Sequence, residues 1–184
     1  TGCTGLLRDN GKQQYSGTFE GNDATIKLAT GEAYGFQTKD TLAVNADGKS
    51  TNPGIGQIYN HSTIGFIPYC NGKVNNLNLS GSIYFNNVDG GEQVSCGALA
   101  GRTDGISITN TVVSTSIVYN DGKGGSKLAN VYAGGYIGST TTDGANISFS
   151  DCSMQGKISS TSNCEHFAIG GYVAYVKANN TEVS

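Results

Sequence analysis

One segment of ten residues occurs three times in this chain, with the same classes of residue at equivalent positions. The copies are 74–83, 108–117 and 149–158. In each copy the first, sixth and tenth residues are apolar, and the third is Asn or Asp. A shared spacing of this kind indicates one structural unit that is used repeatedly. The apolar positions are Val74, Leu79 and Ile83, then Ile108, Val113 and Ile117, then Phe149, Met154 and Ile158.

A second element, rich in glycine, alternates with these segments. It has Gly at its second position, an apolar residue at its fourth, and a small residue or Pro at its fifth. The steps between copies are unequal while the motifs stay constant, which indicates fixed elements joined by connections of variable length. Stacked repeat proteins tolerate insertions in this way. The four copies are 64–69, 96–101, 134–139 and 170–175.

The composition favours an all-β fold. The 184 residues include 28 Gly but only 2 Pro, and charged residues make up 14% of the chain. Short β-branched runs lie between clusters of Gly and Asn, which is typical of strands joined by turns. No stretch has the three-and-four apolar spacing of a helix. We therefore predict an all-β, parallel β-solenoid, in which coils stacked about 4.8 Å apart pair each strand with its equivalents above and below.

The repeats divide the chain into a lead-in, an irregular N-terminal part and a stack of about four irregular coils. In the N-terminal part, Phe19, Ala24 and Ile26 face one side across an Asn-Asp turn, which predicts a hairpin or a first coil. The turn-rich stretch that follows is predicted to be a long projecting insertion. The predicted boundaries are 1–16 for the lead-in, 17–63 for the hairpin or first coil with its insertion, and 64–95, 96–132, 133–168 and a partial 169–184 for the repeats that span 64–184.

Charge and hydropathy exclude two classes of partner. The net charge is −3 and no stretch is rich in Lys or Arg, so the sequence carries no electrostatic footprint for nucleic acid or an anionic membrane. No run of about 18 apolar residues occurs, which predicts no membrane span. The chain begins at Thr1 rather than Met, which indicates processing or a boundary within a longer protein. Thr1-Gly2-Cys3 fits the end of a lipoprotein cleavage box, so lipid attachment of the parent protein is one open alternative.

The five Cys and two His show no metal-ligand spacing, so we predict no metal site and no cofactor. Cys152 stands where the other copies have Leu77 and Thr111, which favours a small core residue. A disulfide between Cys152 and Cys164 is the alternative, and an odd Cys is then left over.

The third position of the repeated segment is expected to form a ladder. Stacked coils bring Asn76, Asn110 and Asp151 into one column, where their side chains bond to one another or to neighbouring backbone. Asn ladders of this kind stabilise stacked parallel strands. We favour this structural role over a ligand site because the position recurs once per coil.

Two tyrosines in the glycine element are candidate ligand-binding residues. If Tyr136 and Tyr172 point outward, they stack as an aromatic strip suited to sugar rings or protein partners. The alternative is that they are partly buried and cover the surface of the coil.

The glycine element followed by an Asn-centred strand resembles the GLUG-type repeats of bacterial cell-surface proteins. The segment 17–26 is also similar to the Gly-x-Phe-Asp-Gly-Asn-x-x-Thr-Ile opening that often precedes such arrays. The chain departs from the pattern at Pro68 and Ala174, which replace the second Gly, and at Ser139, where an aromatic is common. The resemblance implies a right-handed parallel β-helix on a secreted or surface-anchored protein, often associated with adhesion.

These observations predict an extracellular structural or adhesive domain that is not an enzyme. Most of its acidic residues lie in Asp-Gly turns, Asp151 falls in the ladder, and Cys164-Glu165-His166 lacks a third orienting group for a thiol nucleophile. The alternative is a carbohydrate-binding or carbohydrate-cleaving module. The expected partner is a protein or glycan on a surface. The last repeat stops at Ser184, where its Asn-centred strand should begin, so we also predict self-association through an open edge.

Overall fold

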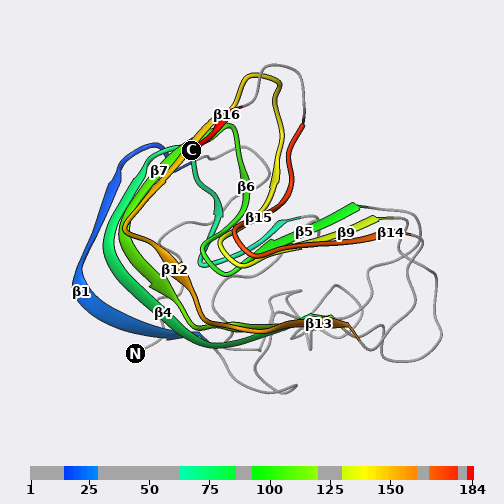
Figure 1. Cartoon of the computed structure of the whole chain (residues 1–184), viewed down its shortest axis with the longest axis horizontal. Helices are drawn as coiled ribbons and strands as arrows, with labels where there is room; N and C mark the ends of the chain where they lie inside the picture. Colours follow the sequence, from blue (N-terminus) through cyan, green and yellow to red (C-terminus); the bar gives the residue numbers. More distant parts are fainter. Residues whose placement is uncertain (1–14, 29–62, 86–92, 120–129, 161–165, 178–181) are drawn as a thin grey trace, which may run out of the picture.

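A computed structural model describes residues 15–28, 63–85, 93–119, 130–160, 166–177 and 182–184. These residues form strands and turns, with no helix among them, which confirms the all-β prediction. Every pairing between the described strands is parallel, and the strands form three sheets. Figure 1 shows that strands far apart in the sequence lie side by side in each sheet.

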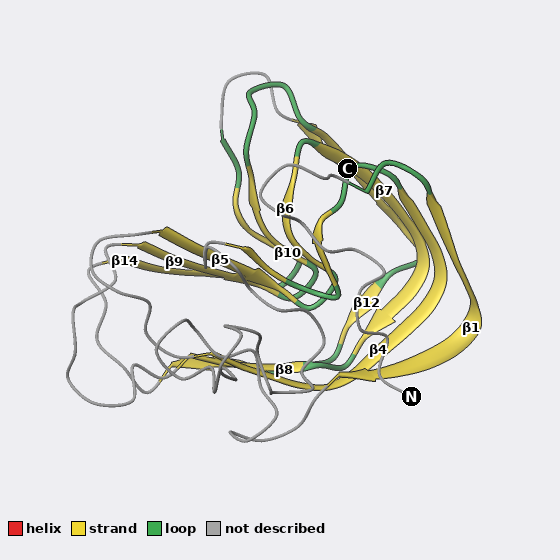
Figure 2. Ribbon diagram, turned by 180° about the vertical axis from the view of Figure 1, so that it is seen from behind, coloured by secondary structure: helices red, strands yellow, loops and turns green. Residues whose placement is uncertain are grey.

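The largest sheet, which we call sheet A, has the strand order β13-β8-β4-β7-β11-β16, with β1 paired to β4 and β12 paired to β7. Its strands β1, β4 and β7 curve strongly in both views (Figures 1 and 2). The strands of sheet A are β1 (Thr18–Leu28), β4 (Lys73–Phe85), β7 (Gly105–Val113), β8 (Ser116–Tyr119), β11 (Asn146–Ser150), β12 (Ser153–Met154), β13 (Ile158–Ser160) and β16 (Glu182–Val183).

Two smaller sheets follow one another along the chain within each repeat. Sheet B has the order β14-β9-β5-β2, and sheet C has the order β15-β10-β6-β3. Tight glycine turns connect each strand of sheet B to a strand of sheet C. The strands of sheet B are β2 (Thr63–Ile64), β5 (Gln93–Gly97), β9 (Asn130–Gly134) and β14 (His166–Gly170). The strands of sheet C are β3 (Ile67–Tyr69), β6 (Ala100–Thr103), β10 (Ile137–Thr140) and β15 (Val173–Tyr175).

Strand register in sheet A joins the positions that the sequence alignment matched. Ile108 pairs with Val74 on one side and with Phe149 on the other. The sixth and tenth positions of the repeated segment pair in the same way, so that Val113 and Ile117 each lie between their two equivalents. The apolar pattern therefore predicted these parallel pairs correctly.

In the glycine element the alignment is wrong by one residue at the second copy, 96–101, whereas Ile64 with Cys96 and Gly134 with Gly170 pair as the sequence aligned them. The structure pairs Gly97 with Gly134 and Ala100 with Ile137, whereas the sequence alignment matched Cys96 with Gly134. The shift arises because β5 enters the turn with a single Gly, while the next copy has Gly134 and Gly135 in succession. The sequence alignment matched Gly97 with Gly135, because both stand second in their copies, whereas the partner of Gly97 in the sheet is Gly134.

The conserved spacing of Asn and Asp in sheet A coincides with a bend in each strand. Asn76, Asn110 and Asp151 have φ values of 52°, 45° and 54°, and Asn22 and Asp23 in β1 have 51° and 59°. This is the left-handed region, which Asn and Asp tolerate better than other non-glycine residues. The register of β1 on β4 is interrupted at this point, between Glu20 and Ala24.

The left-handed residue sets which side chains face the core. On β4 the fully buried residues are Val74, Leu77 and Leu79, so the alternation skips one place across Asn76. Side chains of sheets B and C, such as Val94 and Ile137, complete the same apolar cluster. Full burial of one such aliphatic side chain contributes about 1.5–3 kcal/mol.

Residues 15–28, the described part of the N-terminal region, form no hairpin. Residues 18–28 form the single strand β1, which pairs in parallel with β4 on both sides of its bend: Phe19 with Val74, and Ile26 with Leu79. The hairpin alternative is therefore wrong. Residues 1–14 of the lead-in and 29–62 of the predicted insertion lie outside the described residues.

Candidate functional site

The Asn ladder is present across three strands of sheet A. The side-chain amide of Asn110 donates to Oδ1 of Asn76 at 2.7 Å, and the amide of Asn76 donates to Oε1 of Glu20 at 2.7 Å. The hydrogen bond from Asn76 lowers the pKa of the Glu20 carboxyl. Asp151 does not extend this chain of bonds in the described residues, since its carboxylate accepts from the Ser150 hydroxyl at 3.0 Å.

The backbone explains the choice of Asn and Asp at these positions better than a ligand does. The exposed side chains bond to one another, and the left-handed φ excludes most other residues. We therefore assign the column a structural role.

A pair of substitutions at Asn110 separates backbone conformation from hydrogen bonding. Asn110→Ala and Asn110→Gly both remove the hydrogen bond to Asn76, but only the alanine Cβ is sterically disfavoured in the left-handed conformation. We expect Asn110→Ala to be less stable than Asn110→Gly by about 1 kcal/mol. Urea denaturation followed by circular dichroism measures the difference. Equal stability of the two variants would mean that the side-chain hydrogen bond, and not the backbone φ, accounts for the asparagine at position 110.

Tyr136 does not point outward, so the structure agrees with the alternative that the ring is buried. Its side chain is 0% exposed, and its hydroxyl lies 2.5 Å from the carbonyl oxygen of Thr111 and 2.7 Å from that of Ser153. Burial raises the pKa of this hydroxyl. Tyr136 does stack on Tyr172, with ring centroids 5.2 Å apart and planes 6° apart. Only the outer ring, Tyr172, is available to a ligand.

Four large apolar side chains are exposed among the described residues, and all come from the last repeat. They are Ile169 at 54%, Tyr172 at 37%, Tyr175 at 40% and Val183 at 47%; we call them the end face. Ile169 and Tyr175 lie on β14 and β15, which are the outermost strands of sheets B and C.

The opposite ends of sheets B and C are different. There the outermost strands are β2 and β3, and their residues Ile64 and Ile67 are both 0% exposed. An outermost strand presents unpaired backbone N–H and C=O groups. Apolar side chains beside such an edge make the end face the clearest docking surface that the described residues offer.

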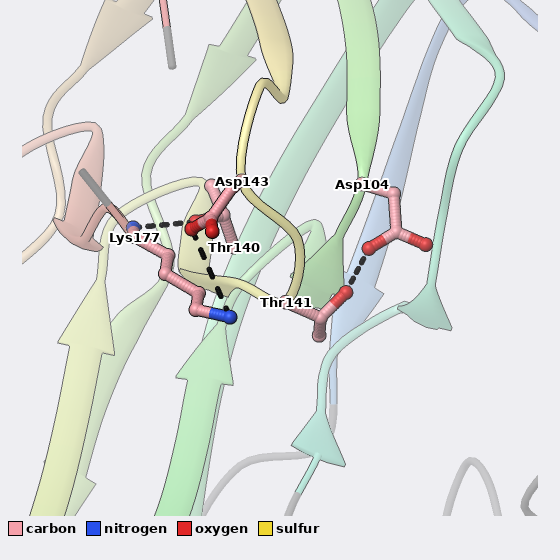
Figure 3. A network of polar contacts seen from close by, with 5 residues as sticks. All are labelled: Asp104, Thr140, Thr141, Asp143 and Lys177. Carbon is pink, nitrogen blue, oxygen red and sulfur yellow. Dashed lines mark hydrogen bonds and ion pairs between the residues drawn. The ribbon is translucent and has the colours of Figure 1, made fainter. Parts of the chain in front are cut away.

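A polar network occupies the corner between sheets C and A (Figure 3). The Asp104 carboxylate accepts hydrogen bonds from the hydroxyls of Thr141 and Tyr69 and, at 3.3 Å, from the amide of Asn71. Desolvation, and then the hydrogen bond to Asp104, raise the pKa of Tyr69. The backbone N–H of Lys177 donates to the Thr140 hydroxyl at 2.7 Å. These bonds hold successive turns together at the corner.

At the edge of the same network, the ammonium of Lys177 lies 3.7 Å from a carboxylate oxygen of Asp143 (Figure 3). Both side chains are about half exposed. An exposed pair of this kind contributes less than about 1 kcal/mol.

Sequence reasoning missed a row of side chains on sheet C. The register places Tyr69, Arg102, Ser139 and Tyr175 on four adjacent parallel strands. Tyr132 of sheet B stacks on Tyr175, with centroids 4.5 Å apart and planes 15° apart. The signal in the sequence was a Tyr at one position of the first and last repeats. The one-residue misalignment placed Gly101, not Arg102, in that row.

The described cysteines are free thiols: Cys70 and Cys96 are buried, and Cys152 is half-buried. Burial raises the pKa of Cys70 to about 11 and raises those of Cys96 and Cys152. A thiol whose pKa is raised forms less thiolate at neutral pH and is therefore a poor nucleophile.

Cys152 packs against the core and is not in a disulfide. Its predicted partner Cys164 and the neighbouring Glu165 lie outside the described residues, as does Cys3. His166 is exposed on β14.

Among the described residues, no helix has the length and apolarity needed to cross a membrane. No group of three or more His, Cys, Asp or Glu side chains gathers there as a metal ion would require.

Comparison with known proteins gives no match to this chain among family models, curated proteins or solved structures. A function has to be inferred from the end face and from the row on sheet C.

Proposed function

We propose that this chain is a right-handed parallel β-solenoid of about four irregular coils, related to the GLUG-type repeats, and that it serves as a structural or adhesive domain outside the cell. Three points support this architecture. All pairings are parallel, equivalent positions of successive repeats pair with each other, and the chain moves from sheet A through sheets B and C in each repeat. Parallel crossover connections are right-handed in nearly all proteins.

The role we propose is attachment through the end face to a neighbouring protein chain. The observation that carries this proposal is the concentration of exposed apolar side chains beside the outermost strands β14 and β15. A second chain that adds strands there satisfies the unpaired backbone groups and covers Ile169, Tyr172 and Val183 in one step. The proposal assigns no catalytic residue.

Light scattering tests this attachment between copies of the chain. We expect the wild-type protein to gain mass reversibly with concentration, and Ile169→Asp to weaken the association at least tenfold because a carboxylate would be buried in an apolar interface. Ala24→Asp adds the same charge to an exposed residue of β1, which pairs with β4 and lies outside the end face, and serves as the control. A wild-type protein that stays monomeric at 1 mM (roughly the weakest useful affinity) rules out self-association.

The stacked pair Tyr132 and Tyr175 supports a second candidate function, a carbohydrate-binding module. Exposed aromatic rings offer flat apolar surfaces on which the C–H faces of sugar rings can stack. Both functions agree with a secreted or surface location and with a protein or glycan partner.

A further inference from the structure

Arg102 is a cation with no partner among the described residues. Its Nε is buried and donates no hydrogen bond, and no carboxylate of the described residues forms an ion pair with it. Desolvation lowers its pKa, and Tyr69 partly offsets this effect. A buried donor without an acceptor costs about 1–3 kcal/mol. An arginine in this state is well suited to accept an anionic ligand.

The nearest acid by position in the sequence is already engaged. Asp104 accepts hydrogen bonds from Tyr69, Thr141 and Asn71. The same bonds fix the Tyr69 side chain beside Arg102, since the two residues pair across β3 and β6. The hydrogen bonds of Asp104 therefore hold Tyr69 in place at one side of the row, and no ion pair with Arg102 forms among the described residues.

The other side of Arg102 leads to an aromatic surface. Ser139 follows on β10, and its hydroxyl bonds with that of Ser95 at 2.8 Å. Tyr175 follows on β15, stacked on Tyr132. Adjacent parallel strands lie about 4.8 Å apart, so Arg102 and Tyr175 are separated by about 10 Å, a distance that two linked sugar rings can span.

We propose that Arg102 and Tyr175, with Tyr69 and Tyr132 beside them, bind a polysaccharide that carries carboxylate groups. Ser139, which lies between them in the row, is 0% exposed and makes no contact with the ligand. The guanidinium of Arg102 binds the carboxylate of one sugar through paired N–H donors. The exposed ring of Tyr175, two strands away on β15, stacks on a neighbouring sugar of the same polysaccharide. The net charge of −3 and the one guanidinium in the row favour a saccharide with no more than one carboxylate per sugar over a more highly charged, sulfated polyanion. This inference deepens the second candidate function. Tyr175 also belongs to the end face, whereas Arg102 does not, so the Arg102 variants test this site separately from attachment through the end face.

Calorimetric titration with three tetrasaccharides, of galacturonate, glucuronate and mannuronate, tests the site. We expect at least one of them to bind, and its methyl-esterified form to bind at least tenfold more weakly because the ester removes the charge. Arg102→Gln should weaken binding at least tenfold, Arg102→Lys by less, and Tyr175→Ala by about fivefold. Lys157→Gln removes an exposed positive charge from the linker between β12 and β13 and should leave binding unchanged.

Several results would overturn the site. They are an absence of binding by all three saccharides at millimolar concentration, equal binding by the esterified form, or undiminished binding by Arg102→Gln. Inorganic phosphate that binds as tightly as the best saccharide would show a general anion site instead. Thermal melting shows whether the variants fold. Light scattering of Arg102→Gln should match that of the wild type, so failure of this site is distinguishable from failure of the end face.

Discussion

Replacing Gly134 with alanine is expected to lower the free energy of unfolding by about 3 kcal/mol or more, at the upper end of the overpacking range. Gly134 ends β9 at the tight turn into sheet C. A Cβ added there would overlap the carbonyl oxygen of Ile137, and would lie 2.7 Å from the Ile137 carbonyl carbon and 3.0 Å from the backbone nitrogen of Ala174. All three atoms belong to backbone, so no side chain can move aside to make room.

Gly171 provides the matched control. It occupies the equivalent turn of the last repeat, and a Cβ added there would meet nothing within 4 Å. We expect Gly171→Ala to change stability by less than about 0.5 kcal/mol. Urea denaturation of the two variants beside the wild type measures both values. Similar losses in the two variants would contradict the close packing of the turn at Gly134.

Tyr136→Ala is expected to cost about 3–5 kcal/mol, as for other large buried aromatic side chains. The ring is fully buried, stacks on Tyr172, and meets Phe149 edge to face with centroids 5.4 Å apart. If this variant does not fold, Tyr136→Phe isolates the hydroxyl. Loss of the hydroxyl leaves the carbonyl oxygens of Thr111 and Ser153 without this donor. We expect the free energy of unfolding to fall by about 1–2 kcal/mol.

Tyr172→Ala is the comparison for this prediction, because Tyr172 is partly exposed on the same stack. We expect it to lose about 1 kcal/mol, mainly the aromatic contact. Differential scanning calorimetry gives the order of the three variants. A Tyr136→Ala protein that is as stable as Tyr172→Ala would contradict the burial of the Tyr136 ring.

The strand pairing of sheet A could be predicted because its apolar residues are the ones that face the core. Val74, Ile108 and Phe149 pair with one another since each must face the same core from neighbouring strands. A slip by one residue would expose all of them. The parallel all-β arrangement follows from this register, while the solenoid and its coil count stay proposals.

The turns were less predictable because glycine carries no side chain to fix its register. Matching Gly97 with Gly135 rather than with Gly134 shifted the row on sheet C and concealed Arg102. The direction of a side chain at a tight turn also has no periodic signal. The sequence therefore left two orientations open for Tyr136, and the chain turns it toward Thr111.

The strictly parallel pairing has a consequence for how quickly this chain reaches its native state. Every ladder between the described strands joins residues such as Val74 and Ile108 that are separated by a complete repeat, so none of these strand pairs can form through a short hairpin. Each intervening segment must lose conformational entropy before the hydrogen bonds of the ladder can form. Folding should therefore be slow, and growth outward from one completed repeat, which then serves as a template for the next, is the economical route.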